Sequence, residues 1–290
     1  MKFCDIHIRD PFILPEDGKY YLYGSRGETC WGPASGFDVY VSDDLENWSQ
    51  PTAIFENDGT FWSNLHYWAP EVHKYKGSYY LFASFNSETR HRGTQILKSD
   101  SPMGPFVPIS DGPVTPSEWE CLDGTLYVED GVPYIVFCHE WVQCKDGEMY
   151  ALQLTDDLTA CVGEPMLLFK ASSFKRVRTV EDRGNGEDGW YVTDGPFMYT
   201  TAEGKLLMIW SSFSKEGGYC ELISYPDNNK INGKWICDDR CLFEKNGGHG
   251  MIFKSFDGKL YFIAHTPNKT PEERPVLFEI CEKNGSLYIK

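Results

Sequence analysis

Five short segments of this 290-residue chain each place a polar side chain beside a proline or glycine. These side chains are Asp10, Glu71, Asp123, Asp194 and His249, at intervals of 61, 52, 71 and 55 residues. A lone Asp before Pro or Gly usually forms a turn, but four acids at matching places in a repeat are expected to converge. Carboxylates held close together acquire different pKa values, so that one can donate a proton while another accepts one. The spacing therefore indicates acid–base chemistry.

Two carboxyl groups separated by a water-sized gap are what inverting glycoside hydrolysis requires. One acid protonates the leaving oxygen and the other activates a water molecule. Trp31, Trp68 and Trp141 lie in or near the same segments, and aromatic faces pack against the C–H surfaces of sugar rings. Acids and aromatic residues together favour a carbohydrate ligand, although each tryptophan taken singly is also typical of core packing.

The elements that must carry these residues are β-strands. After each polar residue comes a turn glycine and then an alternating aromatic run, in the segments 9–25, 69–85, 122–140, 193–213 and 249–266. A further alternating run follows every hairpin. Such period-2 runs separated by turn residues are typical of meander hairpins. Five repeats of about four strands predict an all-β, five-bladed β-propeller with four-stranded antiparallel blades, formed by residues 1–290 as a single domain. The alternative is a β-sandwich with accidental internal similarity, and residues 171–189 read as a long loop between the third and fourth repeats.

Composition restricts the partners. Lys and Arg number 27 against 43 Asp and Glu, a net charge of −16, which argues against nucleic acid and anionic membranes because both need a positive face. The first fifteen residues lack the pattern of an export signal, and the ten cysteines are scattered as expected of reduced, packing thiols. We therefore expect a cytoplasmic protein with an oligosaccharide as partner, and the oligomeric state stays open.

Five ordered motifs give the chain a resemblance to a known family. RDPFI with Asp10, WAPEV with Trp68 and Glu71, LDGTLYVEDG with Asp123, TDGPF with Asp194, and GGHG with His249 look like the inverting glycoside hydrolases of family 43. The resemblance covers essentially the whole chain.

The resemblance implies a role for each matched residue. Asp10 would be the general base, Asp123 would raise the pKa of the proton donor and orient it, and Asp194 would be the general acid. Calcium near the channel axis, beside His249, is implied as a possible cofactor, with no organic cofactor. The side chains expected to contact substrate are Arg9, Trp31, Trp68, Glu71, Glu140 and Trp141.

The fourth motif departs from the family, which usually has Glu where this chain has Asp194. Because Asp is one methylene shorter, the donor would be misplaced unless the backbone shifts, and a misplacement of about 1 Å can cost roughly 100-fold in rate. Three explanations compete. Asp194 serves a substrate seated deeper, Glu140 donates the proton instead, or the protein binds sugar without cleaving it.

The implied activity is exo-acting removal of terminal pentose, α-L-arabinofuranosyl or β-xylosyl, from plant-type oligosaccharides. Exo action is expected because the loops 31–37, 62–67 and 171–188 could wall off a pocket. The alternatives are a retaining fructan-type propeller hydrolase, suggested by the Arg9, Asp10, Pro11 segment, and a non-catalytic carbohydrate-binding propeller. The fructan-type enzymes carry an Asp nucleophile upstream of that segment, whereas eight residues precede Arg9 here. A purely structural, metal-binding role for the acid cluster is a further alternative.

Overall fold

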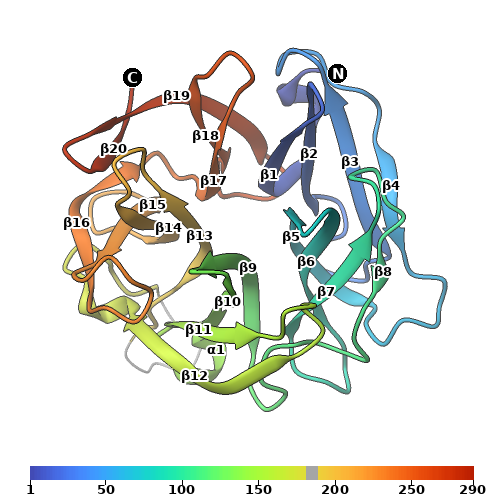
Figure 1. The fold of residues 1–290 in the computed structure, drawn as a ribbon, viewed down its shortest axis with the longest axis horizontal. Helices are drawn as coiled ribbons and strands as arrows, with labels where there is room; N and C mark the ends of the chain where they lie inside the picture. The colour runs from blue at the N-terminus through green and yellow to red at the C-terminus, as the bar shows by residue number, and fades with distance from the viewer. Residues whose placement is uncertain (181–188) are drawn as a thin grey trace.

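Five four-stranded antiparallel sheets surround a central axis in the computed structural model, which describes residues 1–180 and 189–290 (Figure 1). Each blade is built from consecutive strands, with its first strand innermost. Blade 1 contains β1 (Ile8–Glu16), β2 (Lys19–Arg26), β3 (Gly36–Ser42) and β4 (Thr52–Glu56). Blade 2 contains β5 (Leu65–Tyr75), β6 (Ser78–Asn86), β7 (Gly93–Ser99) and β8 (Val107–Pro108). Blade 3 contains β9 (Cys121–Glu129), β10 (Val132–His139), β11 (Glu148–Leu154) and β12 (Cys161–Lys170).

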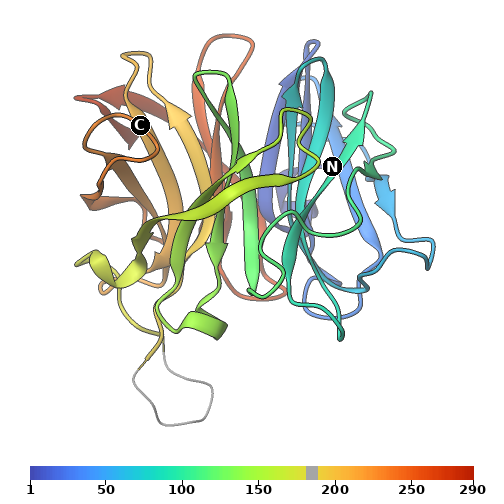
Figure 2. The same ribbon diagram turned by 60° about the horizontal axis from the view of Figure 1, so that its bottom comes forward.

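The remaining blades follow the same order. Blade 4 contains β13 (Asp194–Thr200), β14 (Leu206–Phe213), β15 (Tyr219–Pro226) and β16 (Trp235–Phe243). Blade 5 contains β17 (Gly248–Lys254), β18 (Leu260–Thr266), β19 (Arg274–Lys283) and β20 (Ser286–Ile289). The helical elements are η1 (Phe3–Asp5), α1 (Trp141–Cys144) and η2 (Ala171–Ser173). Figure 2 shows the short green helix α1 at one end of the propeller. The predicted five-bladed propeller is confirmed. Among the described residues, no helix is long and apolar enough to cross a membrane.

Aromatic residues fill the space between neighbouring blades. Between blades 1 and 2, the rings of Phe37, Tyr67 and Phe85 pack against one another with centroids 4.8 to 5.8 Å apart. All three side chains are fully buried. Large β-branched and aromatic residues suit a pleated surface that is covered on both faces. This packing explains the high aromatic content and fixes each blade relative to the next.

An identical β-bulge interrupts the first strand of every blade. In blade 1, Arg9 pairs with Ser25 and Phe12 with Tyr23, so that β1 carries one residue more than β2 between these pairs. The same offset occurs in the other four blades. Within each bulge one residue adopts a left-handed backbone with φ between 48° and 58°: Asp10, Ala69, Asp123, Gly195 and His249. A bulge re-aims side chains locally, and here it does so at the same level in all five blades.

This bulge corrects the register expected from the sequence. Counting from the left-handed residue, the equivalent of Asp10 in blade 2 is Ala69, and Glu71 matches Phe12. Asp194 lies one position earlier than expected and matches Arg9. The equivalence of Glu71 and Asp194 with Asp10 was therefore wrong. The expectation matched the five segments by their polar residues. In the structure, the equivalent positions are instead the Pro or Gly that follows each left-handed residue.

Hydrogen bonds between neighbouring blades hold the five left-handed residues in place. The backbone N–H of each left-handed residue donates to a side chain of the preceding blade: Ala69 to Ser25 at 2.8 Å, Asp123 to Ser84 at 2.8 Å, Gly195 to Asp123 at 3.0 Å, His249 to Ser211 at 2.6 Å, and Asp10 to His265 at 3.3 Å. Left-handed non-glycine residues cost of the order of 1–3 kcal/mol each and persist where their surroundings hold them. The last of these bonds also joins blade 5 to blade 1, where Arg9 Nη1 pairs with Glu273 at 2.6 Å. The ring is thus closed by side chains.

Candidate active site

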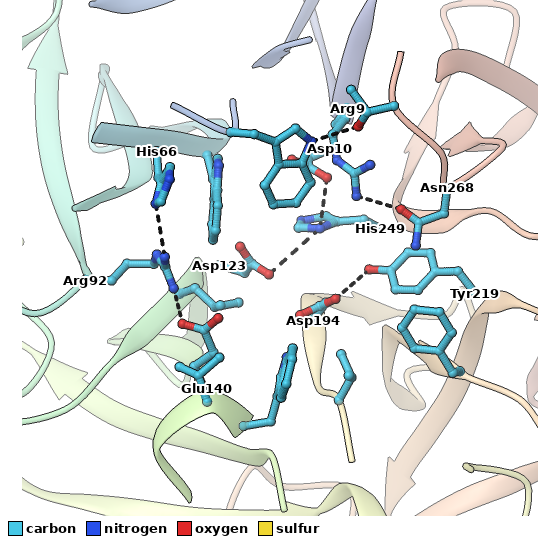
Figure 3. Close-up of a pocket in the computed structure, with 18 of the residues that line it drawn as sticks. Arg9, Asp10, His66, Arg92, Asp123, Glu140, Asp194, Tyr219, His249 and Asn268 are labelled. Atoms are coloured by element: carbon cyan, nitrogen blue, oxygen red, sulfur yellow. Dashed lines mark hydrogen bonds and ion pairs between the residues drawn. The ribbon is translucent and has the colours of Figure 1, made fainter. Parts of the chain in front are cut away.

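A cavity of about 910 Å³ opens at the axis of the propeller. Two layers of first-strand residues contribute to its wall. The left-handed layer supplies Asp10, Asp123 and His249, and the layer one residue earlier supplies Arg9, Trp68, Leu122 and Asp194. Figure 3 shows how Asp10, Asp123, His249 and Asp194 gather at the centre of the cavity. The structure therefore brings together the three acids to which the sequence assigned catalytic roles.

Asp10 is held as an ionised carboxylate. Its Oδ2 accepts a hydrogen bond from Ser25 at 2.5 Å, and its Oδ1 lies 3.2 Å from His249 Nδ1. Burial opposes ionisation, but the charges of His249 and Arg9 outweigh it and lower the pKa of Asp10 below its usual value. On its other side, His265 accepts the Asp10 N–H, and burial lowers the pKa of His265 to about 3. Asp10 is thus a carboxylate ready to accept a proton.

The pKa of Asp194 is shifted in the opposite direction from that of Asp10. Burial and the neighbouring Asp123 raise its pKa from 3.8 to about 7, although the Tyr219 hydroxyl donates to Asp194 Oδ2 at 3.0 Å and favours the ionised form. Burial and Asp10 also raise the pKa of Asp123 well above its usual range. Near neutral pH a large fraction of Asp194 carries a proton. Groups with such divergent pKa values in one cavity are typical of an acid and base pair.

Glu140 lies at the far side of Asp123, in a second charged group. Its carboxylate is paired with Arg92, whose guanidinium stacks over the Trp68 ring at 4.0 Å and lies 3.4 Å from His66 Nδ1 (Figure 3). Burial raises the pKa of Glu140 despite the opposing charge of Arg92. The Glu140 carboxylate is engaged by a buried guanidinium, whereas the hydrogen-bond partner of Asp194 is the neutral Tyr219 hydroxyl. Of the two candidate donors, Asp194 is therefore the better placed.

Aromatic side chains surround the acids. Trp31 lies edge-on to Trp68 at 5.3 Å, and its Nε1 donates to Thr270 at 2.7 Å. On another part of the wall, Trp141 and Trp190 meet edge-to-face at 5.0 Å. Trp31, Trp68, Trp141 and the guanidinium of Arg9 all line the cavity, as the sequence predicted for substrate contacts. Their contact with a sugar stays a prediction.

Glu71 is placed elsewhere. It does not line the cavity, and its Oε2 lies 2.9 Å from His73 Nε2 in the buried interior. Glu71 lies two residues after the left-handed residue Ala69, past the bulge, and so falls outside the layers that line the cavity.

The residues around His249 do not make a calcium cage. Its Nδ1 lies within hydrogen-bonding distance of Asp10, and the opposite ring edge packs so closely on Gly195 that a Cβ there would lie 2.6 Å from His249 Cδ2. Calcium takes six to eight oxygen ligands, whereas the carboxylate oxygens near the ring are one each from Asp10 and Asp123, at 3.2 and 3.8 Å from His249 Nδ1. Among the described residues, the group of His, Cys and acid side chains close enough to hold a metal is His139, Cys144 and Glu148, away from His249. His249 therefore fits the role of a hydrogen-bond partner of Asp10.

Sequence reasoning missed several residues of the cavity: His66, Arg92, Trp190, Tyr219 and Asn268. Tyr219 begins the third strand of blade 4 and His66 lies near the start of β5, whereas Arg92, Trp190 and Asn268 lie in the connections between strands. These positions are not part of the repeated motif, so the repeat does not predict them. The Pro or Gly after each left-handed residue is the signal that would have aligned Ala69 and Gly195 correctly.

A family model described as "Glycosyl hydrolases family 43" matches residues 4–282. The chain belongs to glycosyl hydrolase family 43. Its structure is similar to the crystal structure of an endo-arabinase from Bacteroides thetaiotaomicron, with 39% identity, a TM-score of 0.90 and coverage of 98% of both chains. The family, with relatives named as arabinase, arabinofuranosidase and xylosidase, identifies the protein as a glycosidase that acts on substrates containing arabinose or xylose.

Two curated proteins are also similar. One is the extracellular exo-α-(1→5)-L-arabinofuranosidase ArbA of Cellvibrio japonicus, 24% identical over 91% of this chain and 79% of that protein. The other is the extracellular endo-α-(1→5)-L-arabinanase 1 of Bacillus subtilis, 27% identical over 48% of this chain and 45% of that protein. Both are extracellular, which contradicts the expectation of a cytoplasmic protein. That expectation rested on the first fifteen residues, and the composition of a folded domain does not report its compartment.

Proposed function

We propose that this glycosidase is an inverting, exo-acting enzyme that removes terminal pentose residues from plant-type oligosaccharides, with α-L-arabinofuranosyl favoured over β-xylosyl. The observation that carries the proposal is the divergence of two acids in one cavity, with the pKa of Asp10 lowered and that of Asp194 raised to about 7. The names of the endo-arabinase and of ArbA support arabinose as the sugar.

The mechanism follows from the contacts of each acid. Asp10, ionised and held by Ser25 and His249, accepts a proton from a water molecule as that water attacks the anomeric carbon. Asp194 protonates the oxygen of the leaving sugar at the same time. Asp123 lies next to both, and its Oδ2 accepts the Gly195 N–H and so holds the backbone beside the donor. General acid and general base catalysis each contribute about 10²- to 10⁴-fold.

Exo action is supported by contacts across the rim. Trp31 of the loop after β2 reaches Thr270 of the loop after β18, and Trp141 of α1 reaches Trp190. These contacts connect neighbouring loops along the wall of the cavity, which favours a pocket over an open groove. Of the loop 171–188 that was expected to help, residues 181–188 lie outside the described residues.

The test is a panel of nitrophenyl glycosides and α-linked arabino-oligosaccharides, with proton NMR of the first product formed. We expect arabinose to be released as the β-anomer from an α-linked substrate, because a water molecule attacks opposite the leaving group. Release of the α-anomer would instead support the retaining, fructan-type alternative. Binding of oligosaccharides with no product from any substrate would support the non-catalytic alternative.

A further inference from the structure

A second cavity of about 920 Å³ lies beside the first, on blade 2. It is formed between the end of β6 at Asn86 with the connection that follows, which includes Arg90, and the segment before β9, which includes Asp111, Ser117 and Glu120. None of these side chains belongs to the acid–base machinery described above.

One layer of side chains separates the two cavities. Arg92 lines both of them. His66, which lines the first cavity, lies 3.3 Å from the amide nitrogen of Asn86, which lines the second. The backbone N–H of Glu140 donates to the carbonyl of Glu120 at 2.7 Å, again linking one wall to the other.

This layer is rigidly built. Arg92 is only 7% exposed, its guanidinium is paired with Glu140, and it stacks over Trp68 at 4.0 Å (Figure 3). A long side chain that is stacked on one face and paired at its charged end has little freedom left to lose when a ligand binds beside it. A pre-formed surface of this kind reduces the ordering cost of binding.

The walls of the second cavity suit a neutral, hydroxyl-rich ligand. Asp111 and Glu120 supply acceptors, Arg90 supplies donors, and Ser117 supplies both. Arg90 is positioned over the Trp62 ring at 5.6 Å and reaches across the cavity, where a Cβ at Gly112 would lie 3.0 Å from its Nη1. Mixed charges favour a neutral sugar over a phosphate or a strongly charged peptide.

We infer that the second cavity binds further sugar units of the same chain whose terminal residue occupies the first cavity, and that the chain crosses Arg92. The inference rests on the proposed function and adds a preference for longer oligosaccharides. The value of kcat/KM would then rise with each added sugar unit until the second cavity is filled.

The experiment compares hydrolysis of α-linked arabino-oligosaccharides, from the disaccharide to the hexasaccharide, by wild type, Arg90→Ala and Ser117→Trp. The first variant removes a donor and the second fills the cavity with an indole ring. Lys98→Ala is the matched control, because Lys98 also stacks over an aromatic ring, Tyr80, at 5.6 Å but lies outside both cavities.

We expect kcat/KM of wild type to be about tenfold higher for the hexasaccharide than for the disaccharide, equivalent to about 1.4 kcal/mol. This ratio should fall towards one in Arg90→Ala and Ser117→Trp and stay unchanged in Lys98→Ala. A wild-type ratio near one, or a ratio that neither cavity variant lowers, would overturn the inference while leaving the proposed function in place.

If wild type cleaves none of these chains, the proposed function fails, and calorimetry then tests the second cavity separately. Asp10→Asn protein should bind the hexasaccharide about tenfold more tightly than the disaccharide, and adding Ser117→Trp should abolish this preference. Equal affinity for the two oligosaccharides would contradict the inference.

Discussion

Substitution of Tyr219 by Phe should move the alkaline limb of the pH–rate profile upward. The Tyr219 hydroxyl donates to Asp194 Oδ2 at 3.0 Å, and this bond lowers the pKa of Asp194, which burial and Asp123 have raised to about 7. Loss of the hydroxyl removes a bond that favours the ionised form. The pKa of Asp194 must then rise, and the donor stays protonated to higher pH.

The size of the shift follows from hydrogen-bond energies. A hydrogen bond to a charged group contributes about 1.5–3 kcal/mol, against about 0.5–1.5 kcal/mol for a neutral pair. The difference between the two protonation states is therefore about 1–1.5 kcal/mol. Since 1.36 kcal/mol corresponds to one pKa unit, the alkaline limb should rise by about one pH unit.

The assay is kcat/KM on an unactivated arabino-oligosaccharide across the pH range, because this quantity reports the groups of the free enzyme. Tyr67→Phe is the matched control. Tyr67 is also 2% exposed, and its hydroxyl donates to the Ser63 carbonyl at 2.6 Å, with no contact to the acids of the cavity. An alkaline limb that stays in place in Tyr219→Phe, or moves downward, would refute the reasoning.

Three further outcomes are expected. Asp10→Asn should fold normally by circular dichroism yet lose about 10²- to 10⁴-fold of kcat, and activity above a tenth of wild type would exclude Asp10 as the base. Asp194→Asn should be more stable relative to wild type at pH 8 than at pH 5, by about 2 kcal/mol in urea unfolding, because a folded-state pKa raised from 3.8 to about 7 contributes stability at low pH that is lost as pH rises through 7. An equal difference at both pH values would show that Asp194 titrates normally. Chelation by EDTA should leave the melting temperature and kcat unchanged, given the direct contact of His249 with Asp10, whereas a fall in either would show a bound ion.

The repeat made most of the architecture predictable. The alternating runs and turn glycines sufficed for five blades, because strand period and turn chemistry are local properties of the sequence. Asp10, Asp123 and His249 were placed on the correct layer, since each precedes a Pro or Gly in an otherwise regular repeat. The shared bulge was not visible, so Glu71 and Asp194 were both assigned to a layer that they do not occupy.

The electrostatic state of the site was less predictable. Arg92 and Tyr219 come from outside the repeated motif, yet they are the partners of the two candidate donors, Glu140 and Asp194. Their effect depends on distances between blades, which no single segment encodes. The different surroundings of the two candidate donors therefore became visible in the structure, and the choice between them stays a prediction.

The most direct test of the account is the dependence of Asp194→Ala on the leaving group, compared with Glu140→Ala. Substrates with a dinitrophenyl leaving group need little protonation, whereas unactivated oligosaccharides need a proton donor. We predict that Asp194→Ala loses about 10²- to 10⁴-fold on oligosaccharides but retains most activity on the dinitrophenyl glycoside, and that Glu140→Ala affects both substrates alike. Equal losses on both substrates in Asp194→Ala, or selective loss on oligosaccharides in Glu140→Ala, would contradict the assignment of Asp194 as the acid.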